Sequence, residues 1–204
     1  MQKKTITATI MKKMTEWLAT ITDEKLRSDV KENLLVSGGS VCSMFLNVKV
    51  NDYDVYIKSQ SVLMRLVQYY SKMYGIKILN GDERARYIKE LEKNYNEDIT
   101  GINNAYAISV RNLKPGQIKL FMESSKGGLK VNESATEEEK LKFIPLFFSP
   151  NAISLSNDIQ IVCRFHGDAE AIHKTFDFIH ATNYFTFETG LVTNLEAVES
   201  ILTR

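Results

Sequence analysis

The spacing of apolar residues in the first half of the chain predicts helices that alternate with short strands. From Ile10 to Ile21 the apolar positions recur at the spacing of one face of an amphipathic helix. The elements expected after it are a helix over 23–33, a strand over 34–37, a helix over 39–47, a strand over 53–58, a helix over 61–74 that ends at Gly75, a strand over 76–79 and a charged helix over 82–94. A loop is expected over 95–104.

From Ala105 onward the pattern changes to β-structure. The expected strands cover 105–112, 118–124, 129–131, 153–155 and 159–165, with short helices over 137–143 and 167–175, a β-rich stretch over 176–187 and a helix from 195 onward. Thr136 followed by Glu139 fits a capping box at the start of helix 137–143. The last helix reaches Arg204 without a C-cap signal, so we expect the native chain to continue beyond this truncated end.

These elements predict an α/β fold with a single domain over residues 1–204. A mixed sheet forms the core, with the Asp-x-Asp strand at its centre and helices packed on it. Residues 81–150 are expected to be an insertion that consists of a helix and a β-hairpin. A chain of 204 residues is long enough to bury the core of one such domain.

The most informative segment combines a glycine turn with two aspartates. The turn follows strand 34–37 and opens helix 39–47, and its residues are Ser37, Gly38, Gly39 and Ser40. Asp52 lies twelve positions after Ser40, and Asp54 follows on the same face of an alternating strand, so their backbones are about 6.5–7 Å apart. Two such carboxylates can share a divalent cation, or two cations about 3.5–4 Å apart. Backbone N–H groups of the turn can hold the phosphates that these ions neutralise, which indicates phosphoryl or nucleotidyl transfer.

The order of these motifs resembles the DNA polymerase β-like nucleotidyltransferase superfamily: an apolar strand, then Gly-Gly-Ser, then Asp-x-Asp in a second apolar strand. A narrower resemblance covers most of the chain. The segments NDYDVYIKS, SPNAISLSNDIQIVCRFHG and FDFIHATNYF resemble predicted nucleotidyltransferases of tailed bacteriophages and large viruses. The resemblance implies that Asp52 and Asp54 bind Mg²⁺ or Mn²⁺, and that the turn from Ser37 to Ser40 anchors the β- and γ-phosphates of a nucleoside triphosphate (NTP).

Members of this superfamily usually carry a third acidic residue on a strand beside the Asp-x-Asp strand. Strand 159–165 resembles that element, but its expected acid position is Gln160, which can bind through its carbonyl oxygen and cannot act as a base. The other candidate is Asp177, which lies between two phenylalanines, where a charge is costly unless it is paired or metal-bound. Asp177 could instead cap a turn or pair with an arginine. We expect it to complete the catalytic and metal-binding cluster with the two aspartates.

Four further residues have alternative interpretations. Lys58 shares the predicted face of the aspartates and could contact a triphosphate, although an exposed lysine at a strand end is equally common. The three histidines, His166, His173 and His180, recur every seven residues. They fall on a turn, a helix and a strand, so the sequence does not predict that they converge on a zinc ion.

Composition narrows the protein class further. The 26 basic and 25 acidic residues nearly balance, so no global field attracts nucleic acid. No stretch approaches the roughly 18 apolar residues of a membrane helix, and the N-terminus lacks the apolar core of a signal peptide. Cys42 and Cys163 lie in apolar runs and are expected to be buried thiols. We therefore expect a cytoplasmic protein without membrane contact, in the host cytoplasm if a phage encodes it.

The expected function is metal-dependent transfer of a nucleoside monophosphate (NMP) from an NTP to an acceptor hydroxyl. The acceptor stays open between an RNA 3′ end, a protein and a small molecule. The alternative is a degenerate nucleotidyltransferase domain that binds a nucleotide or a protein partner, which Gln160 favours and the intact Asp-x-Asp disfavours. A purely structural phage protein would have no nucleotide affinity. The sequence has no GxxxxGK[ST] motif, so a Walker-type NTPase is not expected.

Overall fold

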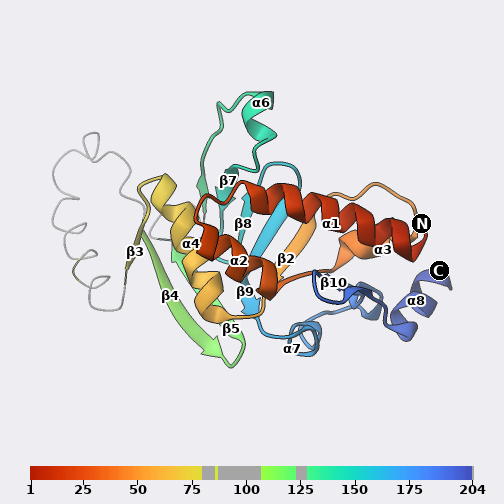
Figure 1. Cartoon of the computed structure of the whole chain (residues 1–204). Helices are drawn as coiled ribbons and strands as arrows, with labels where there is room; N and C mark the ends of the chain where they lie inside the picture. Colours follow the sequence, from red (N-terminus) through yellow and green to blue (C-terminus); the bar gives the residue numbers. More distant parts are fainter. Residues whose placement is uncertain (80–85, 87–106, 123–127, 204) are drawn as a thin grey trace.

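The computed structural model describes residues 1–79, 86, 107–122 and 128–203 (Figure 1). The helices are α1 (Lys3–Ala19), α2 (Glu24–Asn33), α3 (Gly39–Phe45), α4 (Gln60–Met73), α6 (Glu137–Lys140), α7 (Ala169–His173), the 3₁₀-helix η2 (Ile179–Ala181) and α8 (Leu195–Leu202). The strands are β1 (Leu34–Ser37), β2 (Tyr53–Ile57), β3 (Lys77–Leu79), β4 (Ala107–Lys114), β5 (Gln117–Met122), β6 (Leu129–Lys130), β7 (Pro145–Phe148), β8 (Ala152–Leu155), β9 (Ile159–His166), β10 (Tyr184–Thr186) and β11 (Gly190–Val192). The α/β class expected from the sequence is confirmed.

The strands form one mixed sheet in the order β11-β10-β1-β2-β9-β5-β4-β3. Strand β2 runs parallel to β9, and β3 runs parallel to β4, whereas the other neighbours along this path are antiparallel. Strand β8 pairs with the first half of β9, and β7 and β6 follow beyond it. Strand β2, which carries Asp54, therefore lies in the interior of the sheet, with β1 on one side and β9 on the other.

Local capping signals fix several helix ends where the sequence predicts them. The side chain of Asp23 accepts a hydrogen bond from a backbone N–H in the first turn of α2, and Ser59 does the same for α4. Thr136 and Glu139 form the expected capping box at α6. Gly75 follows α4 with a φ of 65°, a conformation that glycine adopts without strain.

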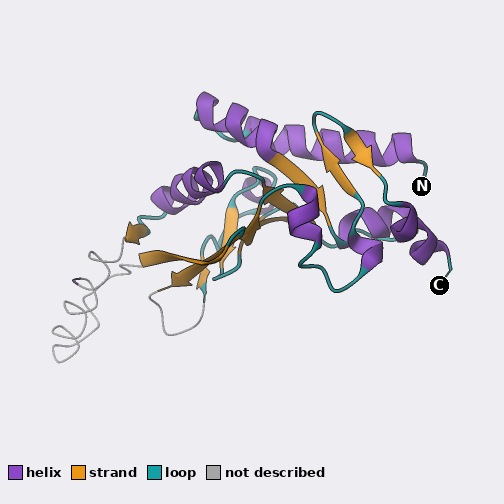
Figure 2. Cartoon of the chain, turned by 90° about the horizontal axis from the view of Figure 1, so that it is seen from below, coloured by secondary structure: helices purple, strands orange, loops and turns teal. Residues whose placement is uncertain are grey.

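The two faces of the sheet are covered by different helices. Helices α1, α2 and α4 pack on one face and bury the main hydrophobic core, in which Trp17 is the largest fully buried side chain. On the other face α7 covers a smaller cluster around Leu35, Tyr56, Val162 and Ile172. Figure 2 shows the long helix α1 along one side of the sheet and short helices near the C-terminus on the other side. The side chain of Asp54 belongs to this second face, because it alternates with the core-facing Val55.

The structure corrects the expected β-rich stretch over 176–187. Only β10 is a strand there, and η2 precedes it. The length of β10 is limited by the strand beside it. Strand β1 is four residues long, and only its residues Val36 and Ser37 pair with β10. Strands β7 and β11 were not expected from the sequence. Strand β7 pairs with β6 and β8, and β11 pairs with β10.

The expected insertion over 81–150 is only partly described. The hairpin of β4 and β5 continues the main sheet, since β5 pairs with β9 through Gln117 and Phe165. The predicted helix 82–94 lies outside the described residues except for Arg86, which is helical, and the predicted loop 95–104 lies outside them entirely. In the described ranges, no helix has both the length and the apolar character that crossing a bilayer requires.

A buried hydrogen bond between Trp17 and Tyr70 joins α1 to α4, with the indole Nε1 donating to the phenol oxygen at 2.9 Å. Tyr70→Phe should lower the free energy of unfolding by about 1–3 kcal/mol, because the indole N–H is left buried without an acceptor. Tyr69→Phe is the matched control: its hydroxyl contacts the exposed Thr22, so the loss should stay below about 1 kcal/mol. Urea unfolding followed by tryptophan fluorescence measures both values, and equal losses would contradict this role.

Candidate functional site

Asp54 and Gly38 pack against each other where β1 and β2 end. The strand register pairs Ser37 with Asp54, and Gly38 then begins the turn into α3 with a φ of 93°. A Cβ atom on Gly38 would lie 2.8 Å from Oδ2 of Asp54, so the carboxylate would have to shift to admit a side chain. The backbone conformation favours glycine here, and the missing Cβ leaves room for the carboxylate.

The rest of the turn leaves unfilled space and an unused polar atom. Gly39 has no positive φ, and a Cβ there would meet nothing within 4 Å. Of the two glycines, Gly38 is therefore the one with a positive φ, whereas close approach of a phosphate to Gly39 stays a prediction. The hydroxyl of Ser40 is buried and has no hydrogen-bond partner among the described residues.

The hydroxyl of Ser37 is committed to bonds within the protein. It donates toward the carbonyl oxygens of Ala181 and Asn183, at 3.1 and 2.9 Å, and lies 2.9 Å from Nε2 of His173. Since the single hydroxyl proton points to the carbonyls, His173 must donate from Nε2. The Ser37 hydroxyl therefore fixes the turn to the segment after α7, and the anchoring of phosphates by this turn stays a prediction. Sequence reasoning missed the contact with His173 because 136 positions separate the two residues.

Burial and a neighbouring charge disfavour the ionised form of Asp54. Burial is the larger cause and the carboxylate of Asp52 the smaller one, and together they raise the pKa of Asp54 to about 6. No described residue donates a hydrogen bond to its side chain or forms an ion pair with it. Asp52 itself is exposed and lies just before β2. The pair is therefore a site of uncompensated negative charge.

A row of polar side chains crosses the sheet at this level. The register runs from Tyr184 on β10 to Ser37 on β1, then to Asp54 on β2 and to Gln160 on β9. Partners in register point to the same face, and neighbouring strands are about 4.8 Å apart, so the row spans roughly 14 Å. The expected placement of Gln160 beside the Asp-x-Asp strand is confirmed. What Gln160 binds stays a prediction.

The oxygen atoms of the two aspartates and of the turn are suitable ligands for a hard divalent cation. Carboxylate and hydroxyl oxygens are the ligands that Mg²⁺ prefers, and Mg²⁺ commonly uses one or two carboxylates with substrate phosphates and water completing its shell. Asp54 and Asp52 would supply the carboxylates, and Ser40 has an oxygen without a partner in the described part of the chain. Within that part, no group of three or more His, Cys, Asp or Glu side chains is arranged to share a metal ion.

The argument that assigned Asp177 to the metal cluster is wrong in its premise. Asp177 is exposed in a bend between α7 and η2, and Phe178 beside it is 64% exposed. An exposed carboxylate is solvated by water and needs no metal as counter-charge. The role of Asp177 as a metal ligand with Asp52 and Asp54 stays a prediction.

Lys58 directly follows β2, at the end of the strand away from the turn. Its backbone N–H bonds to the carbonyl of Asn33, at the end of the β1–β2 ladder opposite to Gly38. Four residues of strand place it about 13 Å from Asp54 along β2. This spacing does not support a direct contact with the turn, and the role of Lys58 as a phosphate ligand stays a prediction.

A pocket of about 480 Å³ adjoins the polar row on the side of Tyr184. Its lining includes His173, Lys174, Ile179, Thr182, Tyr184 and Asn194. Burial lowers the pKa of His173, so the imidazole facing this pocket is neutral near pH 7. Ser37 lies between this pocket and Asp54. It contacts His173 and is in register with Tyr184 on one side and with Asp54 on the other.

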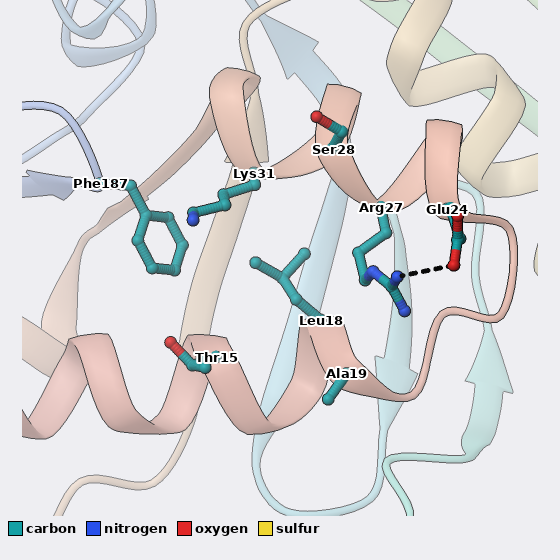
Figure 3. Close-up of a pocket in the computed structure, with 8 residues that line it drawn as sticks. All are labelled: Thr15, Leu18, Ala19, Glu24, Arg27, Ser28, Lys31 and Phe187. Atoms are coloured by element: carbon teal, nitrogen blue, oxygen red, sulfur yellow. Dashed lines mark ion pairs between the residues drawn. The ribbon is translucent and has the colours of Figure 1, made fainter.

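A second pocket, of about 450 Å³, lies between α1 and α2 (Figure 3). Arg27 forms an ion pair with Glu24 at 3.7 Å, and the ammonium of Lys31 lies 5.3 Å from the centre of the Phe187 ring. Its cations are therefore engaged within the protein. Helices α1 and α2 cover the sheet face opposite to Asp54, so this pocket is separate from the candidate site.

Comparison with known proteins gives one match. The model of a family described as Gabija anti-defense 2 family protein matches residues 8–204 of the chain. No curated protein matches the chain. No solved structure matches it either.

Asp54→Asn should stabilise the metal-free protein at high pH. The folded-state pKa of about 6 lies above the ordinary 3.8, so the ionised carboxylate destabilises the fold above pH 6, and this effect disappears as the pH falls from 6 to 4. Removing the charge should add about 1–2 kcal/mol to the free energy of unfolding near pH 8, discounted for partial exposure, and little near pH 4.

Thermal unfolding with EDTA across this pH range measures the effect. Asp52→Asn is the matched control, because its exposed carboxylate should change stability by less than about 0.5 kcal/mol. An Asp54→Asn variant no more stable than the parent near pH 8 would contradict the assignment of a destabilised carboxylate.

Proposed function

The chain belongs to the Gabija anti-defense 2 family, and on that premise we propose that it is a metal-dependent nucleotidyltransferase that acts against the Gabija defense. It transfers an NMP from an NTP to an acceptor hydroxyl, in the cytoplasm of a phage-infected host. The family description supports the anti-defense role and states no chemistry. The support for the chemistry comes from the candidate site and from the resemblance of its motifs.

The observation that carries the proposal is the uncompensated carboxylate of Asp54 beside Gly38. The pKa of this half-buried carboxylate is raised by burial and by the charge of Asp52, so its ionised form destabilises the fold unless a cation binds there. The close approach to Gly38 aims this carboxylate at the start of α3, where the backbone N–H groups of the first turn can donate hydrogen bonds to phosphate oxygens. Cation and triphosphate are therefore expected to bind together.

The proposed reaction is an in-line substitution at the α-phosphorus of the NTP. The acceptor oxygen forms a bond to the α-phosphorus, the bond from that phosphorus to the β-phosphate oxygen breaks, and pyrophosphate leaves with the electron pair while the hydroxyl proton passes to water. Asp52 and Asp54 would hold the metal, and the turn from Gly38 to Ser40 would hold the β- and γ-phosphates. Mg²⁺ or Mn²⁺ supplies activation of the acceptor hydroxyl and neutralisation of the leaving group.

A degenerate site that binds nucleotide without transfer is the second candidate. Gln160 favours it, because it is in register with Asp54 at the position where the resembling superfamily has an acid, and an amide cannot take a proton. The two candidates share the binding site and differ only in turnover.

Label transfer separates these candidates. The protein is incubated with each α-labelled NTP, Mg²⁺ or Mn²⁺, and host RNA and protein fractions, and acid-stable label in macromolecules is measured. Transfer should occur with the parent chain and fall at least about a hundredfold in Asp54→Asn, with Glu16→Gln on α1, which covers the opposite face of the sheet, as control. ATP·Mg²⁺ binding without transfer would establish the degenerate site, and calorimetry showing equal affinity in Asp54→Asn would place the site elsewhere.

Gly39→Val should weaken triphosphate binding far more than nucleoside binding. The added side chain enters the open space beside the start of α3, where it would exclude a phosphate. We expect about a tenfold or larger rise in the Kd for ATP·Mg²⁺ and less than about a twofold change for adenosine, both measured by calorimetry. An equal loss for the two ligands would mean that the substitution only disturbs packing.

A further inference from the structure

Large apolar side chains are exposed on α8 and on the segment that contacts it. Leu195 and Leu202 are 77% and 76% exposed, and their spacing of seven residues puts them on one face of α8 while its other face is buried. Phe178 and Ile179 are 64% and 43% exposed at the start of η2, which packs against α8. We call these four residues the η2–α8 surface. Figure 1 shows α8 at the same end of the molecule as α3.

This surface is continuous with the candidate site. Ile179 lines the 480 Å³ pocket, and so does Asn194, the residue before Leu195. The same pocket contains His173, which contacts the Ser37 hydroxyl next to Asp54. A partner that covers the η2–α8 surface would therefore reach the polar row from its Tyr184 end.

Among the described residues, the charged side chains on and beside this surface are mainly acidic. Glu196 and Glu199 are exposed on α8, and Asp177 precedes η2; none of the three forms an ion pair with a described residue. Lys174 is the one basic side chain that lines the pocket, and Glu170 binds it at 2.8 Å. Nucleic acid binding depends on cations that are available for phosphates. This surface instead complements a partner with basic and apolar side chains.

We propose that the η2–α8 surface and its pocket form the acceptor site, and that the acceptor is a protein segment in which basic and apolar residues flank a side-chain hydroxyl. The acceptor role rests on the proposed function. Docking places the hydroxyl at the Tyr184 end of the polar row, from which it approaches the NTP held at Gly38 and Asp54. The apolar anchors bind Leu195, Leu202 and Phe178, and the basic residues bind the glutamates of α8.

The test uses a fluorescent peptide of alternating lysine and leucine around one serine, which is mixed with the chain of residues 1–204, and anisotropy measures binding. The peptide should bind the parent protein, and Leu195→Ser with Leu202→Ser should weaken binding at least about tenfold. Glu196→Gln with Glu199→Gln should weaken it several-fold and remove most of its salt dependence. Leu141→Ser is the matched control, since this leucine is 66% exposed beside α6, and should leave binding unchanged.

Two further ligands decide between acceptor classes. A peptide with glutamate in place of lysine and a fluorescent oligoadenylate RNA should each bind at least about tenfold more weakly than the lysine peptide. RNA that binds as tightly as the peptide would overturn the proposal, and so would peptide binding that the leucine pair does not affect. Circular dichroism of each variant verifies that these exposed substitutions leave the fold intact.

Asp54→Asn separates failure of this surface from failure of the proposed function. It should bind the lysine peptide like the parent protein while losing transfer of label to the peptide serine. The leucine pair variant should retain ATP·Mg²⁺ affinity and lose transfer through a raised KM for the peptide. A leucine pair variant that transfers label to the peptide with the parent KM would refute the acceptor site, even if Asp54 proves catalytic.

Discussion

The candidate site depends on the close approach of Asp54 to Gly38. A carboxylate can come this near to a backbone only where no Cβ intervenes, and the positive φ of Gly38 turns the chain sharply from β1 into α3 at the same point. The approach holds the carboxylate at the first turn of a helix, where backbone N–H groups have no partner within the helix. One glycine thus brings an uncompensated negative charge and a set of free donors together, which is the arrangement that a metal-bound phosphate complements.

The two faces of the sheet differ in composition: one has the main apolar core and the other has the candidate site. On the face of α1, α2 and α4 the core is apolar and is joined by the hydrogen bond of Trp17 and Tyr70. On the other face the cover is smaller, and the polar row remains beside it. The segment after α7 connects this row to the rest of the fold: Ala181 accepts hydrogen bonds from the N–H of Gly38 and the hydroxyl of Ser37. The segment around η2 therefore holds the turn in place through hydrogen bonds, and its exposed apolar residues lie beside the site.

Local signals in the sequence predicted most of the elements and the strands on which Asp54 and Gln160 lie. Apolar spacing gave the helices that cover the core face, and caps such as Asp23 and Thr136 act over three or four residues, so no distant contact was needed to predict them. The alternation around Asp54 predicted its strand, and the resemblance of strand 159–165 predicted Gln160 beside it. These inferences hold because strand periodicity and capping are properties of neighbouring residues.

Contacts between distant segments decided what the sequence could not. Asp177 is flanked by aromatic residues in the chain, but flanking residues do not determine burial, and the bend before η2 leaves it in water. Lys58 shares a face with Asp54, yet the direction of β2 against β1 puts it at the far end of the ladder. His173 reaches Ser37 only because α7 packs on the sheet, and Ser37 thereby becomes a structural residue. The sequence alone determined which chemical groups are present and which are near in the chain, whereas the packing of the sheet determined which of them face one another, because burial and orientation depend on partners that are remote in sequence.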